Sequence, residues 1–301
     1  MRAHIAVPAT CANLGPGFDI LAVALELQNE VDAEQAEIPG IEVDPGPGAP
    51  PELHDPARNL VTVAYALACE AAGVAPGGVR FRCLNRIPFR RGLGSSGAAA
   101  LGGVLACVAL HRPPWGEERI LELAVRLEGH PDNAAAALHG GLTIVAPGVA
   151  PAMLRVDEEL RVVVFIPEVE LSTEEARRVV PQSYSRADAV YNAARCALLV
   201  RAVAERDWRS LRDAMDDRWH QPQRTALMPW LPHLIAAAGD AGAYGASLSG
   251  AGPSVIAFTA GDTSKVENAL CTAAAERGLA GTTLVSRVRN YGARVDSGLV
   301  V

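Results

Sequence analysis

Residues 88–98 read PFRRGLGSSGA and run directly into an apolar stretch, AALGGVLACVAL, over residues 99–110. The glycines predict a tight loop, and the Ala, Leu and Val residues predict a helix that begins near Ser95 and is buried on every face. A helix N-terminus presents unpaired N–H groups and the positive end of the helix dipole, so it suits a phosphate or carboxylate. A plain tight turn before a buried helix is the alternative, because short glycine motifs also match by chance.

The glycine loop differs from three familiar nucleotide-binding or catalytic motifs. A Walker A loop needs a Lys directly after its second Gly, whereas the only Lys in the chain is Lys265. No ribose-binding acid follows about twenty residues on, as the dinucleotide fingerprint requires, and Ala98 stands where a serine-hydrolase elbow needs Gly. A phosphate at this loop would therefore be held by backbone amides, by arginines such as Arg90 and Arg91, and by a metal ion.

The composition of the 301-residue chain sets limits on the class of protein. A net charge of −7 argues against a nucleic-acid surface, which usually carries a basic excess. The longest apolar helix is too short for a membrane span, and the first residues show no signal-peptide pattern, so we expect a cytoplasmic protein. The six cysteines are scattered without a C-x-x-C pair, which predicts neither a zinc site nor a disulfide framework.

Near the N-terminus, residues 13–19 read NLGPGFD between two predicted strands, 4–9 and 20–27. The Gly-Pro-Gly core predicts a constrained turn that carries two polar side chains, Asn13 and Asp19. An ordinary Asx-type turn is the alternative interpretation of this stretch.

Residues 128–133 read EGHPDN and concentrate polar side chains ahead of an Ala-rich helix. Glu128 is a candidate Mg²⁺ ligand, since magnesium in phosphoryl transfer is held by one or two carboxylates plus phosphate oxygens. Asp132 or Asn133 as a plain helix N-cap is the alternative, and a structural role is expected for His130.

The remaining chain predicts alternating helices and strands in two domains, 1–150 and 151–301. A Pro-rich linker over residues 147–151 separates them, residues 39–56 are expected to be an irregular excursion, and a glycine-rich loop is expected over residues 245–254. A capping box over residues 172–175, STEE, predicts a helix that Ser172 or Thr173 starts and that carries Arg177 and Arg178. The other predicted helices cover 60–72, 117–127, 187–206 and 208–218, and the other predicted strands cover 79–85, 142–145, 160–167 and 255–258.

Three loops in this order, 13–19, 88–98 and 245–254, resemble those of the GHMP small-molecule kinases, and the resemblance covers essentially the whole chain. It implies an α+β, two-domain GHMP kinase fold. The N-terminal domain would be like ribosomal protein S5 domain 2, the C-terminal domain would be ferredoxin-like, and the active site would lie between them.

Within this family the motifs are most similar to those of members that phosphorylate L-homoserine with ATP in threonine biosynthesis. The similarity rests on residues 7–19, with Cys11 where Ser is more usual, on residues 128–133, and on Ser172 to Arg177. The alternatives are a related kinase acting on a mevalonate-like acid, and a non-catalytic nucleotide- or metabolite-binding regulator. A small-molecule substrate is expected, with no nucleic acid or membrane partner, and related kinases are often homodimers.

The resemblance also implies roles for individual residues. Asn59 would lie by the adenine, and the ATP phosphates would be held by Pro88, Arg90, Arg91, Gly92, Leu93, Gly94, Ser95, Ser96, Gly97 and Ala98. Mg²⁺ would be held by Ser96 and Glu128. The catalytic set would be Ser96, Glu128, Asn133 and Arg177.

Homoserine is a zwitterion, so its pocket needs an acid for the ammonium and an Arg for the carboxylate. Asp19 fits the first role, and Arg177 and Arg224 fit the second. The alternatives for Arg224 are that it is an ordinary surface charge, or that Arg218 contacts the substrate in its place. The rest of the substrate-binding set is Asn13, Asn133 and Thr173. Because an amide cannot usefully accept a proton, Asn133 predicts catalysis without a dedicated carboxylate base.

Overall fold

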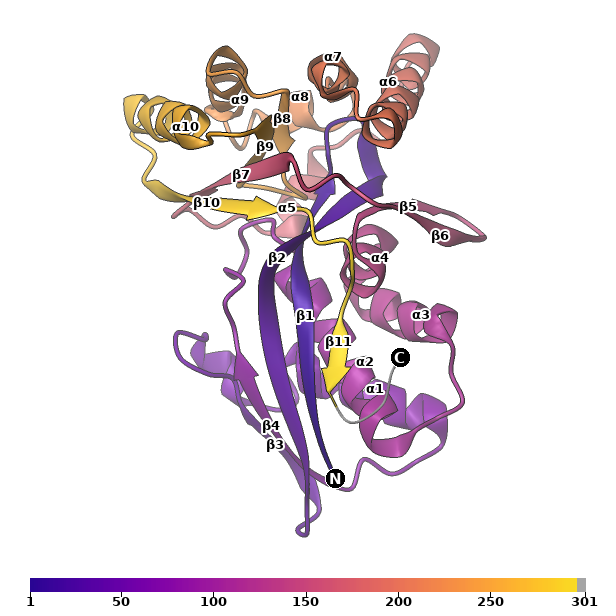
Figure 1. Cartoon of the computed structure of the whole chain (residues 1–301). Helices are drawn as coiled ribbons and strands as arrows, with labels where there is room; N and C mark the ends of the chain where they lie inside the picture. The colour runs from indigo at the N-terminus through magenta and orange to yellow at the C-terminus, as the bar shows by residue number, and fades with distance from the viewer. Residues whose placement is uncertain (297–301) are drawn as a thin grey trace.

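The computed structural model describes residues 1–296, and its first sheet is built around one long strand, β2 (Gly17–Ala36) (Figure 1). This strand pairs antiparallel with β1 (Arg2–Asn13), β4 (Gly78–Leu84) and β5 (Leu142–Ala146). The sheet is completed by β3 (Gly40–Asp44) parallel to β4, β6 (Val149–Leu154) on β5, and β11 (Arg294–Asp296) on β1.

Four helices belong to this first part of the chain: α1 (Leu60–Ala72), α2 (Ser95–His111), α3 (Glu117–Glu128) and α4 (Pro131–His139). The central helix α2 packs against the other three and against β1, and most of its side chains are buried, as its all-apolar sequence predicts. Gly103 allows this packing, because a Cβ there would lie 2.1 Å from the carbonyl oxygen of Val61 in α1.

The second sheet has the strand order β10-β7-β9-β8, formed by β7 (Leu160–Pro167), β8 (Gly245–Leu248), β9 (Val255–Ala260) and β10 (Gly281–Arg287). Helices α9 (Leu231–Asp240) and α10 (Ser264–Glu276) pack on it around a second hydrophobic core. Taken as β7-α9-β8-β9-α10-β10, this is the ferredoxin-like arrangement, so the predicted α+β class and second-domain fold are confirmed.

The remaining helical elements of the described chain range from single short turns to a 20-residue helix, and some of them contribute residues to a cavity wall. They are η1 (Pro51–His54), α5 (Thr173–Arg178), α6 (Arg186–Glu205), η2 (Trp208–Ser210), α7 (Leu211–Ala214) and α8 (Gln221–Arg224). The capping box at Ser172 is confirmed, because its hydroxyl accepts the Glu175 N–H and the Glu175 carboxylate accepts the Ser172 N–H.

Three sequence predictions of local structure are wrong. Residues 39–56 are not wholly irregular, since they contain β3 and η1, and the helix expected over residues 208–218 is broken into η2 and α7. The stretch 147–151 is not a linker but spans the turn of the β5–β6 hairpin, in which Ala146 pairs with Val149. Backbone pairing across strands overrides the local proline signal there, and the division at residue 150 stays a prediction.

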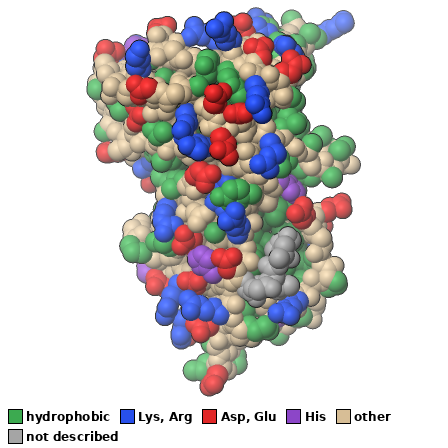
Figure 2. All heavy atoms as spheres, in the orientation of Figure 1, with side chains coloured by type: hydrophobic (Ala, Val, Ile, Leu, Met, Phe, Trp, Pro, Cys, Tyr) green, Lys and Arg blue, Asp and Glu red, His purple; other side chains and the backbone are tan. Residues whose placement is uncertain are grey.

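Charge is intermingled on the face of the molecule drawn in Figure 2, where Lys and Arg side chains lie among Asp and Glu. Within residues 1–296, none of the helices has the length and apolar character that a membrane crossing requires.

Candidate active site

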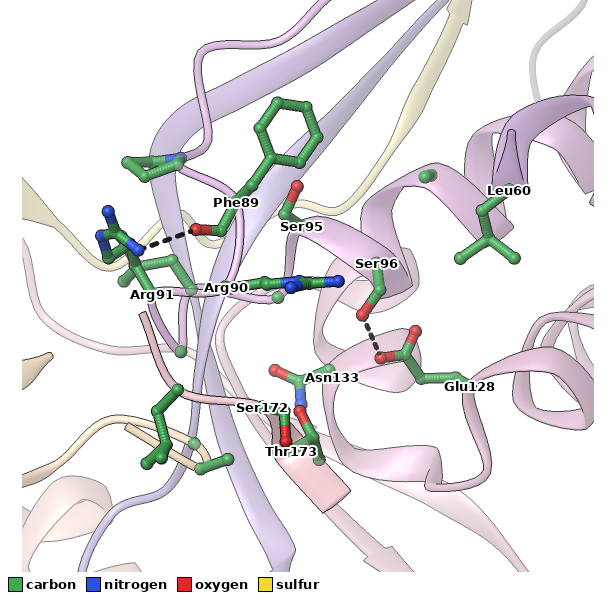
Figure 3. Close-up of a pocket in the computed structure, with 18 of the residues that line it drawn as sticks. Leu60, Phe89, Arg90, Arg91, Ser95, Ser96, Glu128, Asn133, Ser172 and Thr173 are labelled. Atoms are coloured by element: carbon green, nitrogen blue, oxygen red, sulfur yellow. Dashed lines mark hydrogen bonds between the residues drawn. The ribbon is translucent and has the colours of Figure 1, made fainter. Parts of the chain in front are cut away.

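A cavity of about 600 Å³ brings the predicted stretches together. Its wall is formed by the glycine loop, the start of α2, the 128–133 segment, the start of α5 and the loop 250–252 (Figure 3). All the predicted site residues line it except Gly97 and Ala98. The Ala98 N–H already donates to the Gly94 carbonyl at 2.9 Å, so it is not free to bind a phosphate.

The glycine loop has a backbone conformation that only glycine adopts readily. Gly92 and Gly94 have φ angles of 74° and 70°. A Cβ on Gly94 would lie 2.0 Å from Thr10 Oγ1, and one on Gly92 would lie 2.3 Å from the Ser249 carbonyl oxygen. Gly94 is also the N-cap of α2, where no side chain accepts a first-turn N–H. The helix therefore begins with N–H groups available to an anion.

The two arginines of the loop point in different directions (Figure 3). Arg90 extends across the cavity toward Ser96, and its side chain is 66% exposed. Arg91 points the other way, donates to the Glu168 carbonyl at 2.7 Å and lies 3.4 Å from Glu170. Arg90 also lies 3.8 Å from Glu170, but both side chains of this pair are exposed, so Arg90 can exchange it for a phosphate. Arg91 instead holds the loop to the segment after β7.

Glu128 and Ser96 meet at the start of α2 (Figure 3), where the Ser96 hydroxyl donates to Glu128 Oε1 at 2.6 Å. Within the described chain, the other oxygen, Oε2, is buried and has no hydrogen-bond partner. Burial raises the pKa of this carboxyl, opposed by the Ser96 hydrogen bond. A buried, unpartnered carboxylate oxygen beside a hydroxyl and free helix N–H groups fits one Mg²⁺ shared with phosphate oxygens.

Asp19 and Arg177 form a bidentate ion pair across the cavity, with distances of 2.6 and 3.1 Å. Each side chain is 35% exposed, so the pair is open to a ligand. The Phe18 ring lies 5.3 Å from the Arg177 guanidinium carbon and 5.4 Å from that of Arg224. One acidic and two basic groups therefore converge on a single aromatic surface.

Arg224 is 1% exposed, which excludes the surface-charge interpretation. It donates to the carbonyls of Ala176 and Gly250 at 3.1 and 3.0 Å, and to His220 Nδ1 at 3.0 Å. Burial, followed by the neighbouring positive charge of Arg177, lowers the pKa of Arg224 to about 10.

The imidazole of His220 supports this arginine from behind. Burial is the main cause that lowers the pKa of His220 to about 4, and its Nε2 bonds the Gly15 carbonyl at 2.8 Å. Arg218, the alternative substrate contact, pairs with Asp188 at 3.3 Å and does not line the cavity in the described structure.

Two predicted ligand-binding amides are already bonded to the backbone. Asn13 donates to the Gly250 carbonyl at 2.7 Å and accepts the Asp19 N–H at 3.0 Å, so it shapes the loop that presents Asp19. The hydrogen bond from the Asp19 N–H to Asn13 Oδ1 joins residues six positions apart, whereas an Asx-type turn joins residues two positions apart. The stretch is therefore not an ordinary Asx-type turn. Asn59 caps α1 by accepting the Val61 N–H, and it donates to the Leu53 carbonyl.

The 128–133 segment continues into α4, whose N-cap is His130, so the expectation of Asp132 or Asn133 at the N-cap is wrong by position. Asp132 lies in the first turn, is 3% exposed and accepts the Asn133 N–H at 2.8 Å. Burial dominates and raises the pKa of Asp132 to about 7.

Three residues in or behind the cavity wall were missed as site residues by sequence reasoning. Thr10 donates to Asn133 Oδ1 at 2.7 Å, Ser249 donates to the Gly92 carbonyl at 2.6 Å, and His220 supports Arg224. A polar Thr directly after the apolar strand predicted over residues 4–9 was a signal for Thr10. No local pattern distinguished Ser249 or His220 from ordinary loop residues.

Comparisons with known proteins identify the family of this chain. The GHMP kinases N terminal domain matches residues 59–141, and the GHMP kinases C terminal domain matches residues 199–276. A homoserine kinase of Desulfitobacterium hafniense is 39% identical over 298 residues, which are 97% of this chain and 99% of that protein. A homoserine kinase of Halothermothrix orenii is 41% identical over 277 residues, covering 89% and 88% of the two chains.

Among solved structures, that of homoserine kinase from Cytophaga hutchinsonii superposes with a TM-score of 0.88 at 27% identity, and covers 98% of this chain and 97% of its own. The fold is thus that of a GHMP kinase. Within that class, the chain belongs to the homoserine kinase family.

Proposed function

We propose that the chain transfers the γ-phosphoryl group of ATP to the side-chain hydroxyl of L-homoserine, giving O-phospho-L-homoserine and ADP in threonine biosynthesis. The observation that carries this proposal is the Asp19–Arg177 pair, whose two charges match those of an amino acid zwitterion. The ammonium of homoserine forms an ion pair with Asp19, and its carboxylate forms an ion pair with Arg177. Substrate binding therefore replaces one ion pair with two.

Arg224 adds a second positive charge behind the carboxylate site, because its guanidinium lies against the same Phe18 ring as that of Arg177. Asn13 holds the Asp19 loop through the backbone rather than through a free amide. Thr173, in the cavity wall at the start of α5, is positioned to assist in substrate binding.

The phosphates of ATP lie on the N–H groups at the start of α2, with Arg90 extended over them and Asn59 near the adenine end. Mg²⁺, when bound, neutralises charge on the phosphate oxygens, and Ser96 and Glu128 would hold it. Positioning and charge stabilisation are the main requirements, because the transition state of phosphoryl transfer is loose.

In the chemical step, the homoserine hydroxyl oxygen forms the new bond to the γ-phosphorus while the bond to the ADP oxygen breaks. The hydroxyl proton leaves to a phosphate oxygen or to water, without a dedicated carboxylate base. The side chain of Asn133 lines the cavity next to the glycine loop and cannot usefully accept that proton. A cytoplasmic location and a homodimer stay predictions.

The test is a coupled ADP-release assay with three acceptors: L-homoserine, 4-hydroxybutanoate, which lacks the amino group, and mevalonate. A reaction without acceptor gives the background hydrolysis of ATP. We expect turnover with L-homoserine and little with the two acids, because neither acid presents an ammonium to Asp19. Turnover only with an acid would assign a different substrate, and nucleotide binding without ADP release for any acceptor would indicate a regulator.

A further inference from the structure

The side-chain amide of Asn133 is held in one orientation by two neighbours. Its Oδ1 accepts the Thr10 hydroxyl at 2.7 Å, and its Nδ2 lies 3.4 Å from Asp132 Oδ1. The opposite orientation of the amide would place its oxygen against Asp132 Oδ1, an oxygen that already accepts the Asn133 N–H at 2.8 Å. The amide oxygen of Asn133 is therefore satisfied by Thr10, and an N–H remains for the cavity.

Thr10 owes its place to the backbone of β1. The pairing of β1 with β2 is irregular next to Thr10, since Pro8 pairs with Gln28 and Thr10 pairs with Ala24, so that the extra residues lie in β2. The Thr10 N–H donates to the Leu93 carbonyl of the glycine loop at 3.1 Å, and the side chain is 1% exposed. Gly94 packs directly over its hydroxyl, with a hypothetical Cβ only 2.0 Å away.

We infer that Thr10 is a positioning residue that fixes Asn133 as a hydrogen-bond donor to the attacking hydroxyl oxygen, and that ties this donor to the phosphate loop. The inference rests on the proposed function. An N–H on the hydroxyl oxygen leaves the hydroxyl hydrogen free to face a γ-phosphate oxygen. Thr10 thereby sets both the orientation of the homoserine hydroxyl and its position relative to the ATP phosphates.

The test compares Thr10→Val, which keeps the shape but removes the hydroxyl, with Thr10→Ser, which keeps the hydroxyl. We expect Thr10→Val to lower kcat by a factor of about 10 to 100 with little change in the KM for ATP, since small misplacements of a reacting group have effects of this size. Thr10→Ser should recover most of the loss. The matched control is Thr143→Val, at a buried threonine outside the cavity wall whose hydroxyl donates to the Gly140 carbonyl at 2.9 Å. Its kcat should stay near the wild-type value.

A double-mutant cycle separates positioning from general damage to the fold. On an Asn133→Ala background, Thr10→Val should lower kcat no further, because the group it positions is already gone. Additive losses, or a Thr10→Ser variant as poor as Thr10→Val, would overturn the inference. Absence of homoserine-dependent ADP release by the wild-type protein would instead overturn the proposed function.

A spectroscopic measurement keeps the inference testable even if Thr10→Val does not fold. The side-chain amide resonances of Asn133 are assigned by their loss in Asn133→Ala. Adding L-homoserine with a non-hydrolysable ATP analogue to the wild-type protein should shift one of the two amide protons strongly, as expected for a new hydrogen bond. If both protons keep their shifts while the ligands bind, Asn133 is not a donor to the substrate and the inference fails.

Discussion

Arg177 and Arg178 are adjacent on α5 but have different partners, so they form a matched pair for mutation. Arg177 pairs with Asp19 in the cavity, whereas Arg178 pairs with Glu174 on the surface. We expect Arg177→Ala to raise the KM for homoserine by about 10- to 100-fold, since it removes a charge-assisted bidentate contact. The KM for ATP should change little. Steady-state kinetics check this, and an equal effect of Arg178→Ala would contradict it.

Glu128 combines a burial cost with a proposed metal contact. Burial raises the pKa of its carboxyl, and Oε2 lacks a partner among the described residues. We expect Glu128→Gln to lower kcat by about 100-fold or more, because metal charge stabilisation is worth several kcal/mol. The ligand-free protein should become more stable near neutral pH, as Gln avoids the buried charge. Kinetics at varied Mg²⁺ and thermal unfolding measure the two effects, and unchanged kcat would rule out the metal role.

Asp132 predicts a pH dependence of stability. Burial raises its folded-state pKa from 3.8 to about 7, so the folded protein binds the proton more tightly than the unfolded chain. Its contribution to stability is full below pH 3.8 and is lost as the pH rises to about 7. Asp132→Asn should therefore stabilise the protein more at pH 8 than at pH 5, as thermal unfolding would show.

The same variant tests the absence of a carboxylate base. Asp132→Asn should keep most of the wild-type kcat, because the Asn side-chain oxygen can still accept the Asn133 N–H that Asp132 accepts. Complete loss of kcat with unchanged substrate binding and unchanged Mg²⁺ dependence would assign the base to Asp132.

At the scale of an element, the N-cap of α2 is Gly94, where glycine avoids both a strained backbone and a steric clash. A comparison with Gly48 separates these two effects. Gly94 and Gly48 have φ angles of 70° and 74°, but a Cβ on Gly48 would meet nothing within 4 Å. We expect Gly48→Ala to destabilise the fold by only about 1 to 2 kcal/mol, the cost of a left-handed conformation. Gly94→Ala should destabilise it more and remove most activity, because the new Cβ meets Thr10 Oγ1 at 2.0 Å. Unfolding and kinetics of both variants decide this.

The local pattern of α2 was sufficient to predict its start and its burial, and anion binding at its N-terminus stays a prediction. The same kind of reasoning failed at residues 147–151, where proline suggested a linker and strand pairing made a hairpin. Helix signals lie within a few residues of one another. The β5 strand of this hairpin is instead held on β2, where Leu142 pairs with Val23, a partner far earlier in the sequence.

At the scale of the whole molecule, Arg91 connects the glycine loop to the segment that follows β7. We expect Arg91→Ala to lower the unfolding temperature and to raise the KM for ATP only modestly. Arg90→Ala should raise the KM for ATP clearly and change the unfolding temperature little, because the exposed Arg90 side chain reaches toward Ser96 in the cavity. Thermal unfolding and ATP kinetics on both variants compare them directly, and identical profiles would contradict the separate roles.

The sequence alone determined the class of fold, the three loops and most of the residues that line the cavity, because these signals are local residue types at fixed spacing. Only the tertiary structure decided which of those side chains are free. It bonds Asn13, Asn59 and Arg91 to the backbone, pairs Asp19 with Arg177, and places Thr10 under Gly94. The physical reason is that a hydrogen bond depends on distance in space, and pairs such as Asn13 with Gly250 or Asp19 with Arg177 join residues far apart in the sequence.

The glycine loop itself shows the same division. Its residues predict a phosphate site without a lysine, because the N–H groups of a helix N-terminus can bind an anion by themselves. Its proposed use in catalysis involves Glu128 and Asn133, which lie 32 and 37 residues or more beyond the loop's serines and reach the loop through α3 and α4. Packing of those helices against α2 is what turns an anion site into a candidate phosphoryl-transfer site.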